Sequence, residues 1–212
     1  MSLPAPEPPR LDEPSARRVE LLRLSYRLIA TKGMHRMTLQ DVADAAGMSK
    51  ANVVYYFKTK EDLVLSTMRW VLGSVAERIV ATTASASGRD EKIRAMVDVI
   101  FVDPQRNRTF YAVYAELIAH ASRNARFAEL NAWFREIVTG QYADVIRSTG
   151  RESAAEAEET AMLIRALIDG LFIQWLEEDE WVKEHKRYKQ LCVRAILALV
   201  GSADAGASAR RR

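Results

Sequence analysis

Apolar residues recur at helical spacing along almost the whole chain. Between residues 15 and 33, for example, one face of a helix carries Val19, Leu22, Tyr26 and Ile29. The strict alternation of apolar and polar residues that is typical of strands does not occur, and neither do hairpin turns. The pattern therefore predicts an all-α protein of about nine helices.

The same periodicity predicts longer helices in the rest of the chain, separated by breaks at Gly, Ser or Pro. A helix of about 25 residues is expected to begin at Thr59, which suits an N-cap position. Pro104 interrupts the pattern once more, because proline does not fit inside a helix. The further helices are expected at about 93–101, 106–122, 126–148, 152–176 and 181–200.

Two short helices are predicted between Thr38 and Phe57. Thr38 suits the N-cap of the first helix, with Asp41 three residues on, and Gly47 suits a left-handed C-cap. Ser49 restarts the chain as a second N-cap. Two short helices joined by a tight turn are the helix-turn-helix pattern, in which the second helix enters the major groove of DNA. An ordinary αα-hairpin with solvated polar groups has the same geometry, so that alternative remains open on spacing alone.

This stretch resembles the TetR family of repressors from about Val19 to Leu63. The shared string is a Thr opening the second helix, Ala-Gly-apolar-Ser in the turn, an aromatic pair ending in Phe, and then Lys-x-Lys-Glu-x-Leu. Ala51 departs from the family pattern, which usually has Gly there and so leaves more room for backbone approach. Val54 stands where the family most often has Tyr, a common phosphate contact.

The outward side of the second short helix supplies candidate DNA contacts. Asn52 has an amide that can pair bidentately with adenine. From this face and the family pattern, we expect base contacts from Lys50, Ala51, Asn52 and Tyr55. The phosphate contacts are expected from Thr38, Ser49, Tyr56 and Lys60.

Charge is distributed unevenly along the 212 residues, although the net charge is only +3. Residues 10–60 hold ten Lys or Arg against five Asp or Glu, whereas residues 61–209 hold eighteen against twenty-two. A polyanion such as DNA is a natural partner for the basic end. We therefore expect a DNA-binding domain at 15–60 and an effector-binding and dimerisation domain at 61–202, with disordered tails at 1–14 and 203–212.

The larger domain is rich in aromatic residues at helical spacing, together with a few polar groups. Small-molecule sites are mostly apolar with a few polar groups, although such aromatics can equally form a plain core. An apolar or acyl effector fits this composition as well as a cation does. The candidate pocket residues are Trp70, Phe101, Tyr111, Tyr114, Glu116, His120, Trp133, Phe134 and Phe172.

The segment 163–175 resembles the penultimate helix of the choline-responsive repressors of betaine genes within the same family. That resemblance implies a dimeric four-helix bundle made by the last two helices and their mates. The apolar residues of both helices also cover more than one face, which is more than a single core contact uses. The expected interface residues are Leu163, Ala166, Leu167, Gly170, Leu171, Trp175, Leu191, Ile196 and Leu199.

Other chemistry is not indicated by the sequence. Catalytic and phosphate-cradling motifs are absent, and three scattered histidines do not predict a metal site. We expect no cofactor, and a lone buried cysteine at position 192. With no secretory or membrane-spanning segment, the protein is expected in the cytoplasm, at the nucleoid. The leading prediction is a homodimeric, ligand-responsive regulator of an operator; the alternative is an all-α enzyme or carrier whose basic end is incidental.

Overall fold

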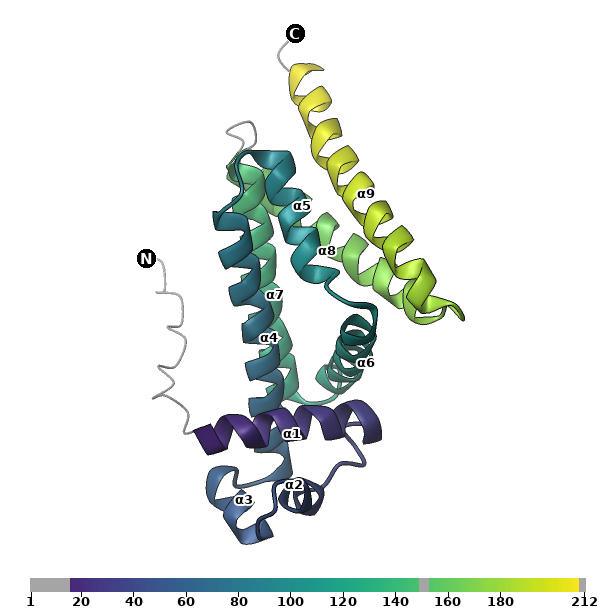
Figure 1. Ribbon diagram of the computed structural model, residues 1–212. Helices are drawn as coiled ribbons and strands as arrows, with labels where there is room; N and C mark the ends of the chain where they lie inside the picture. The colour runs from purple at the N-terminus through teal and green to yellow at the C-terminus, as the bar shows by residue number, and fades with distance from the viewer. Residues whose placement is uncertain (1–15, 149–152, 210–212) are drawn as a thin grey trace, which may run out of the picture. The chain divides into compact units, whose positions relative to one another are not determined.

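The computed structural model describes residues 16–148 and 153–209, with side chains as far as residue 201 (Figure 1). These residues form nine α-helices and no strand, which confirms the all-α prediction. The predicted tail at 1–14 and residues 210–212 lie outside the described ranges. The helices are α1 Ala16–Lys32, α2 Leu39–Ala45, α3 Lys50–Tyr56, α4 Lys60–Ala84, α5 Arg89–Ile100, α6 Pro104–Ala121, α7 Ala125–Arg147, α8 Ala154–Leu176 and α9 Trp181–Ala209.

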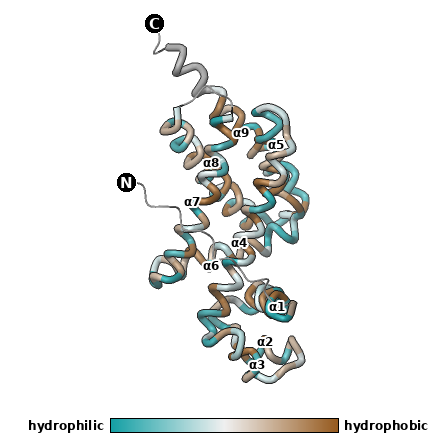
Figure 2. Tube along the Cα trace, turned by 90° about the vertical axis from the view of Figure 1, so that its left-hand side faces the viewer, coloured by the Kyte–Doolittle hydropathy of each residue, from teal (hydrophilic) through white to brown (hydrophobic). Residues whose placement is uncertain are grey.

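The contacts within the chain divide it into two compact units. The first unit ends at Met68 and the second begins at Arg69, so the boundary falls inside α4. Hydrophobic and hydrophilic positions are interspersed along the coloured parts of the helices, as in amphipathic helices (Figure 2). Each unit therefore buries the apolar sides of its own helices in a core of its own.

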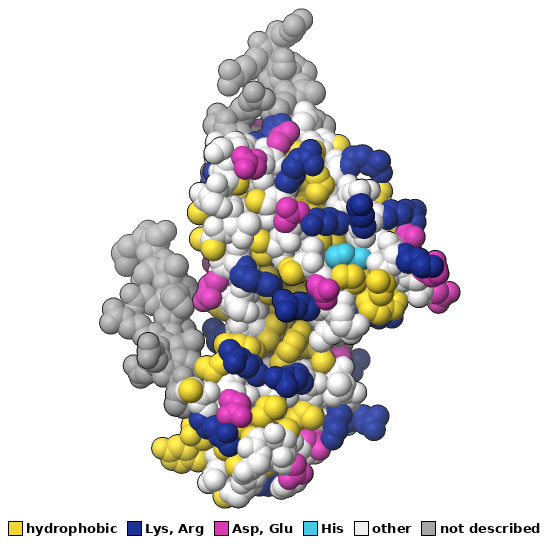
Figure 3. Space-filling view, viewed as in Figure 1, with side chains coloured by type: hydrophobic (Ala, Val, Ile, Leu, Met, Phe, Trp, Pro, Cys, Tyr) yellow, Lys and Arg dark blue, Asp and Glu magenta, His cyan; other side chains and the backbone are white. Residues whose placement is uncertain are grey.

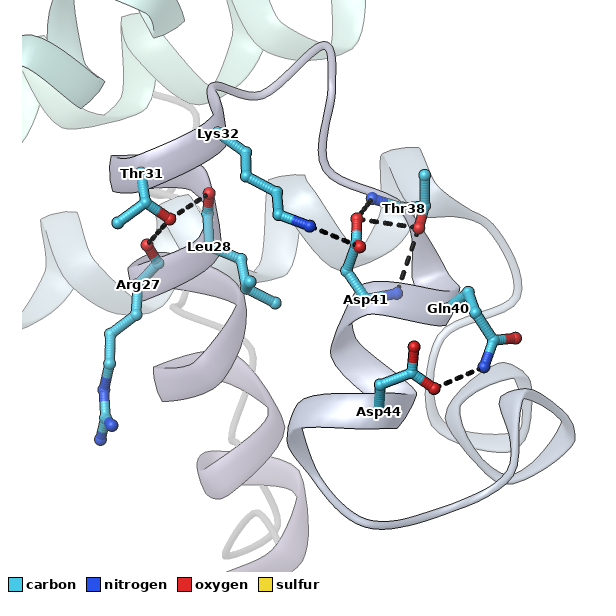
Figure 4. A network of polar contacts seen from close by, with 8 residues as sticks. All are labelled: Arg27, Leu28, Thr31, Lys32, Thr38, Gln40, Asp41 and Asp44. Carbon is cyan, nitrogen blue, oxygen red and sulfur yellow. Dashed lines mark hydrogen bonds and ion pairs between the residues drawn. The ribbon is translucent and has the colours of Figure 1, made fainter.

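The start of α2 is fixed by a capping box. Thr38 Oγ1 accepts from the backbone N–H of Asp41 at 3.1 Å, and the Asp41 carboxylate accepts from the Thr38 backbone N–H at 2.8 Å. Lys32 at the end of α1 donates to the same carboxylate at 2.6 Å (Figure 4). This network confirms the predicted cap and ties α1 to α2.

The capping network has a pH signature. The hydrogen bond from Lys32, followed by those from Thr38, lowers the pKa of Asp41 to about 2. Because this pKa is depressed in the folded protein, the stabilisation is complete above the ordinary value of 3.8 and is lost as pH falls toward 2. The link between α1 and α2 is thus intact throughout the neutral range.

The turn between α2 and α3 forms as the sequence predicts. Gly47 has a φ of +61°, the left-handed conformation that glycine adopts without strain. Ser49 Oγ then accepts from the backbone N–H of Asn52 at 3.2 Å and caps α3. Val53 of α3 is completely buried, which holds the helix against the first unit's core.

Two arginines of α1 brace this module. A guanidinium nitrogen of Arg17 donates to the carbonyl of Ala46 at 2.8 Å, next to the turn. The guanidinium of Arg18 lies 4.5 Å from the centre of the Phe57 ring, at cation–π distance. Both side chains therefore contribute to the packing of the helix-turn-helix.

The second unit is a layered arrangement in which α7 packs against α6 and α8, while α9 packs against α5 and α8. A buried polar contact joins α9 to α6: His185 Nε2 donates to Asn107 Oδ1 at 2.9 Å. Burial, and then Lys189, lowers the pKa of His185, so the ring is neutral at pH 7. Cys192 is buried as expected, and burial raises the pKa of its thiol to about 12.

Two helix boundaries differ from the sequence-based expectation. Pro104 occupies the first turn of α6, where its missing N–H is not needed, and Asp103 caps the helix. Proline therefore begins this helix, which was expected to start at Arg106. At the other end, α9 continues to Ala209, beyond the expected end at Val200.

Removing the cap of α2 should destabilise the first unit. Thr38→Ala deletes the hydroxyl that accepts the Asp41 N–H, and loss of such an N-cap costs about 1 kcal/mol. Urea unfolding of the full chain at pH 7 measures the change. Thr31→Ala is the matched control, because that exposed hydroxyl only bonds carbonyls of its own helix. Equal unfolding midpoints for Thr38→Ala and wild type would contradict the role of the cap.

Candidate DNA interface and effector site

The outward side of α3 presents the residues that the sequence predicts for base contacts. Lys50, Ala51, Asn52 and Tyr55 are all exposed, and the Tyr55 side chain is 77% exposed. The α3 surface thus offers an ammonium group, an amide and a phenol side by side, groups that contact bases in the major groove.

The predicted phosphate contacts differ in how free their polar groups are. Ser49 accepts one hydrogen bond and keeps its own proton to donate. Lys60 gives one of its three protons to the carbonyl of His35 at 2.5 Å, and Tyr56 packs edge-on against the ring of Tyr55 at 5.3 Å. The hydroxyl of Thr38 already donates to the Asp41 carboxylate at 2.9 Å, so a phosphate would have to compete for it.

The core of the second unit is built around the ring of Phe172, which is completely buried. Tyr111 of α6 stacks on it with ring centres 3.6 Å apart, and Phe101 stacks on it at 4.4 Å. Trp175 meets it edge-on at 5.8 Å. These four residues form a continuous aromatic cluster that joins α6 to α8.

Tyr114 extends this cluster and carries its polar group. Its ring lies parallel to Phe110 at 5.8 Å and edge-on to Phe134 at 5.8 Å. Its hydroxyl accepts from a guanidinium nitrogen of Arg165 at 2.8 Å and donates toward Asn131 Oδ1 at 3.4 Å. A hydrogen bond therefore links α6 to α8 beside the aromatic rings.

Asp169 places a carboxylate next to these rings. Its oxygen lies 3.6 Å from Arg165 Nε, one helical turn away. Burial raises the pKa of Asp169, and Arg165 only partly opposes that shift. Burial also raises the pKa values of Tyr111 and Tyr142, and the negative charge of Asp169 adds to both shifts. The second unit thus holds a partly buried carboxylate whose negative charge disfavours ionisation of these tyrosines.

The structure brings together only part of the predicted pocket. Phe101, Tyr111, Tyr114, Phe134 and Phe172 belong to one connected set of rings.

Other predicted pocket residues make different contacts. Trp133 packs against α4, 4.7 Å from the guanidinium of Arg69, and Trp70 is a half-buried residue of α4. His120 donates from Nδ1 to the carbonyl of Glu116 at 2.9 Å, and its ring lies against Phe127.

Sequence reasoning missed several members of this site: Phe110, Asn131, Tyr142, Arg165 and Asp169. A signal for two of them was present. Arg165 and Asp169 are charged residues spaced by four within the otherwise apolar stretch 161–173, and removing charge from water there is costly.

The expected dimer residues divide into exposed and buried groups. Leu163 is 56% exposed and Ala166 is exposed, and the neighbouring Met162 is 64% exposed. Leu167, Gly170, Leu171, Leu191 and Leu199 are partly exposed. Apolar side chains of α8 and α9 thus remain exposed or partly exposed in the single chain.

The structure corrects the expectation for two of the interface residues. Trp175 and Ile196 are completely buried within the single chain, so they have no surface to offer a partner. Trp175 packs on Phe172 and donates from its indole N–H to the carbonyl of Trp181 at 2.7 Å, which closes the turn between α8 and α9. Large apolar side chains of these helices thus supply the core as well as the outer face.

Two segments of the chain match known protein families. Residues 21–67 match the family described as bacterial regulatory proteins, tetR family, and residues 89–201 match the C-terminal part of BetI-type transcriptional repressors. The chain belongs to the TetR family. The predicted resemblance is confirmed, and the protein is a helix-turn-helix transcriptional regulator that binds operator DNA, forms dimers and responds to a small molecule.

Individual relatives span most of the chain. The transcriptional repressor KstR2 of Rhodococcus jostii is 30% identical over 139 residues, covering 63% of this chain and 68% of its own. The regulator BetI of Agrobacterium fabrum is 31% identical over 167 residues, which cover 78% of this chain and 80% of the BetI chain. A transcriptional regulator of Saccharomonospora viridis, solved in complex with choline, has a TM-score of 0.73 at 26% identity and covers 82% of this chain and 92% of its own. No helix among the described residues of this TetR-family regulator is long and apolar enough to cross a membrane.

Substitutions in the DNA-binding unit should separate base contacts from phosphate contacts. Asn52→Ala is expected to relax specificity at one base pair by roughly 1 to 3 kcal/mol, because the amide would read a base edge. Lys60→Ala should weaken all sequences alike and reduce the salt slope of binding by about one unit.

Gel-shift titrations against a selected operator at two salt concentrations measure both effects. Lys183→Ala, which removes an exposed lysine paired with Glu180 on α9, is the control and should bind as wild type does. If Asn52→Ala and Lys60→Ala also bound as wild type does, these assignments would be wrong.

Proposed function

We propose that the effector of this regulator is a small organic cation, bound where Asp169 meets the aromatic cluster around Phe172 and Tyr114. The observation that carries the proposal is geometric: the partly buried Asp169 carboxylate lies 3.6 Å from Arg165 Nε, and the same guanidinium donates to the hydroxyl of Tyr114, whose ring belongs to the aromatic cluster. Aromatic faces and an anion are the groups that hold quaternary ammonium ions. The choline complex of the Saccharomonospora viridis regulator supports the same class of ligand.

Arg165 links effector binding at this site to the contact between α8 and α6. Its guanidinium lies near Asp169 and also donates to the Tyr114 hydroxyl, so it is the resident cation of the site. A cationic effector competes for the Asp169 carboxylate and loosens Arg165 from it. The hydrogen bond that joins α8 to α6 through Tyr114 is then the contact that effector binding changes.

Contacts within the second unit offer a route from this site to α4. α7 packs between α6 and α8, and its Gln141 side chain donates to the carbonyl of Ala76 in α4 at 3.1 Å. Trp133 of α7 packs on Arg69 and lies near Gly73, both also in α4. To release most of the bound DNA, the effector must favour the free form by several kcal/mol.

DNA recognition and dimerisation complete the proposal. We infer that the exposed side of α3 reads bases and that the exposed apolar residues of α8 and α9 form a twofold interface. A symmetric dimer reads two half-sites about one turn of DNA apart, roughly 34 Å, so the operator is a near-palindrome. Such a regulator acts on chromosomal DNA in the cytoplasm.

Removing the Asp169 charge should abolish the response to the effector. Asp169→Asn keeps the size of the side chain, and because burial raises the pKa of the carboxyl, loss of its charge should not lower stability. We expect choline, or another small quaternary amine, to raise the melting temperature of the wild type and to release the operator. Both effects should be lost in Asp169→Asn, which should still bind DNA.

Asp144→Asn is the matched control, since that carboxylate belongs to the same unit but its side chain is 70% exposed. It should respond to the amine as wild type does. Thermal stabilisation by fatty acyl compounds alone, independent of Asp169, would contradict a cationic effector. If the amine stabilised the protein without releasing DNA, the cation site would be supported, but its coupling to α4 would be refuted.

A charge placed on the exposed side of α8 should break the dimer. Leu163→Glu puts a carboxylate among exposed apolar residues, where burial in an interface without a partner is strongly unfavourable. Light scattering at micromolar concentration should show a monomer with weakened operator binding. Val102→Glu is the control, because Val102 is also exposed but lies between α5 and α6. A Leu163→Glu dimer as stable as wild type would rule out this surface.

A further inference from the structure

A groove of about 670 Å³ lies between α5 and α9, apart from the aromatic cluster. Small-molecule sites commonly have volumes of roughly 300 to 1,000 Å³, so a ligand of moderate size fits. The apolar side chains of Val193 and Leu197 are part of its lining. The lining is completed by Arg94, Asp98, Lys186, Lys189, Gln190 and Arg194.

The charges in this groove are unbalanced. Lys189 pairs with Asp98, its Nζ 2.9 Å from the carboxylate. The other three cations, Arg94, Lys186 and Arg194, form no ion pair with any residue that the structure describes. Figure 3 shows Lys and Arg side chains gathered over the part of the molecule where Figure 1 draws α5 and α9. The groove therefore carries positive charge that the chain itself does not neutralise.

The remaining cations near the start of α9 behave differently. Lys183 pairs with Glu180, and Arg187 pairs with Glu184, in each case one helical turn away. The unneutralised positive charge is thus concentrated at the groove rather than spread around α9. Like charges held close together repel, and an anionic ligand removes that repulsion.

We propose that the groove between α5 and α9 binds an organic phosphate that carries an apolar chain. The guanidinium groups of Arg94 and Arg194 match phosphate oxygens with paired N–H donors, and Lys186 adds a third positive charge. Val193 and Leu197, with the aliphatic stems of the basic side chains, contact the chain. A DNA backbone supplies phosphates but nothing apolar to cover these two residues.

The test uses decyl phosphate, below its micelle concentration, and isothermal titration calorimetry of the full-length dimer. The wild type should show saturable binding, and inorganic phosphate should bind at least about tenfold more weakly because it lacks the chain. In the double variant Arg94→Gln/Arg194→Gln, the Kd for decyl phosphate should rise by roughly tenfold or more, since two charge-assisted contacts are lost. Melting temperatures of the variants verify folding.

The matched control is the double variant Lys183→Gln/Arg187→Gln. It removes the same charge from α9 outside the groove, so its Kd should change less than about threefold. Equal weakening in the two double variants would show a general effect of net charge and overturn the proposal. Equal affinity of the Asp169→Asn variant for decyltrimethylammonium and decyl phosphate would overturn it too, because that variant lacks the proposed cation site and the groove would then select only the chain.

Further arms distinguish other occupants. If Asp169→Asn lost decyl phosphate binding, the ligand would bind at the aromatic cluster, and the groove would be refuted as its site. Displacement of decyl phosphate by a short duplex without operator sequence, dependent on Arg94 and Arg194, would replace the small molecule with DNA. Retention on vesicles of anionic phospholipid with the same dependence, and no binding of the soluble amphiphile, would replace it with a membrane surface.

Discussion

Packing of Phe172 between Tyr111 and Phe101 fixes the position of α8, and the functional features of the second unit depend on it. The ring is completely buried, with neighbouring ring centres at 3.6 and 4.4 Å. Asp169 and Arg165 lie one and two helical turns before Phe172, and Arg165 donates to the Tyr114 hydroxyl of α6. A helix rotated away from this packing would lose the aromatic contacts and the polar link to α6 together.

The DNA-binding unit could be predicted almost completely from the sequence, because its determinants are local. The Thr38 cap, the left-handed Gly47 and the Ser49 cap each act over three or four residues. Their residue types alone encode the geometry. What the sequence did not reveal is how a hydroxyl or guanidinium is already used: Thr38 serves its cap, and Arg17 holds the turn of the helix-turn-helix.

The effector site was predicted only in part, because its members come from helices far apart in the chain. The aromatic residues of α6 and α8 were found by their helical spacing, but the same spacing included Trp133, which packs on α4. Asp169 was missed although a charge in this apolar stretch was a signal, because its place beside Arg165 and Tyr114 follows only from the packing of α8 on α6. Apolar periodicity likewise cannot separate a core face from an interface, so Trp175 was assigned to the dimer although it is buried within one chain.

The two sides of α8 connect the proposed ligand site with the proposed dimer interface. Arg165 contacts α6 and lies near the partly exposed Asp169, whereas Leu163 and Ala166 lie on the exposed side. A close-packed helix does not bend locally to absorb a change on one side, so a shift caused at Asp169 also moves the exposed side. In a twofold dimer that side contacts a second copy of the same helix. An effector bound to one protomer therefore changes the surface on which the other protomer rests, and the two sites are expected to respond together rather than independently.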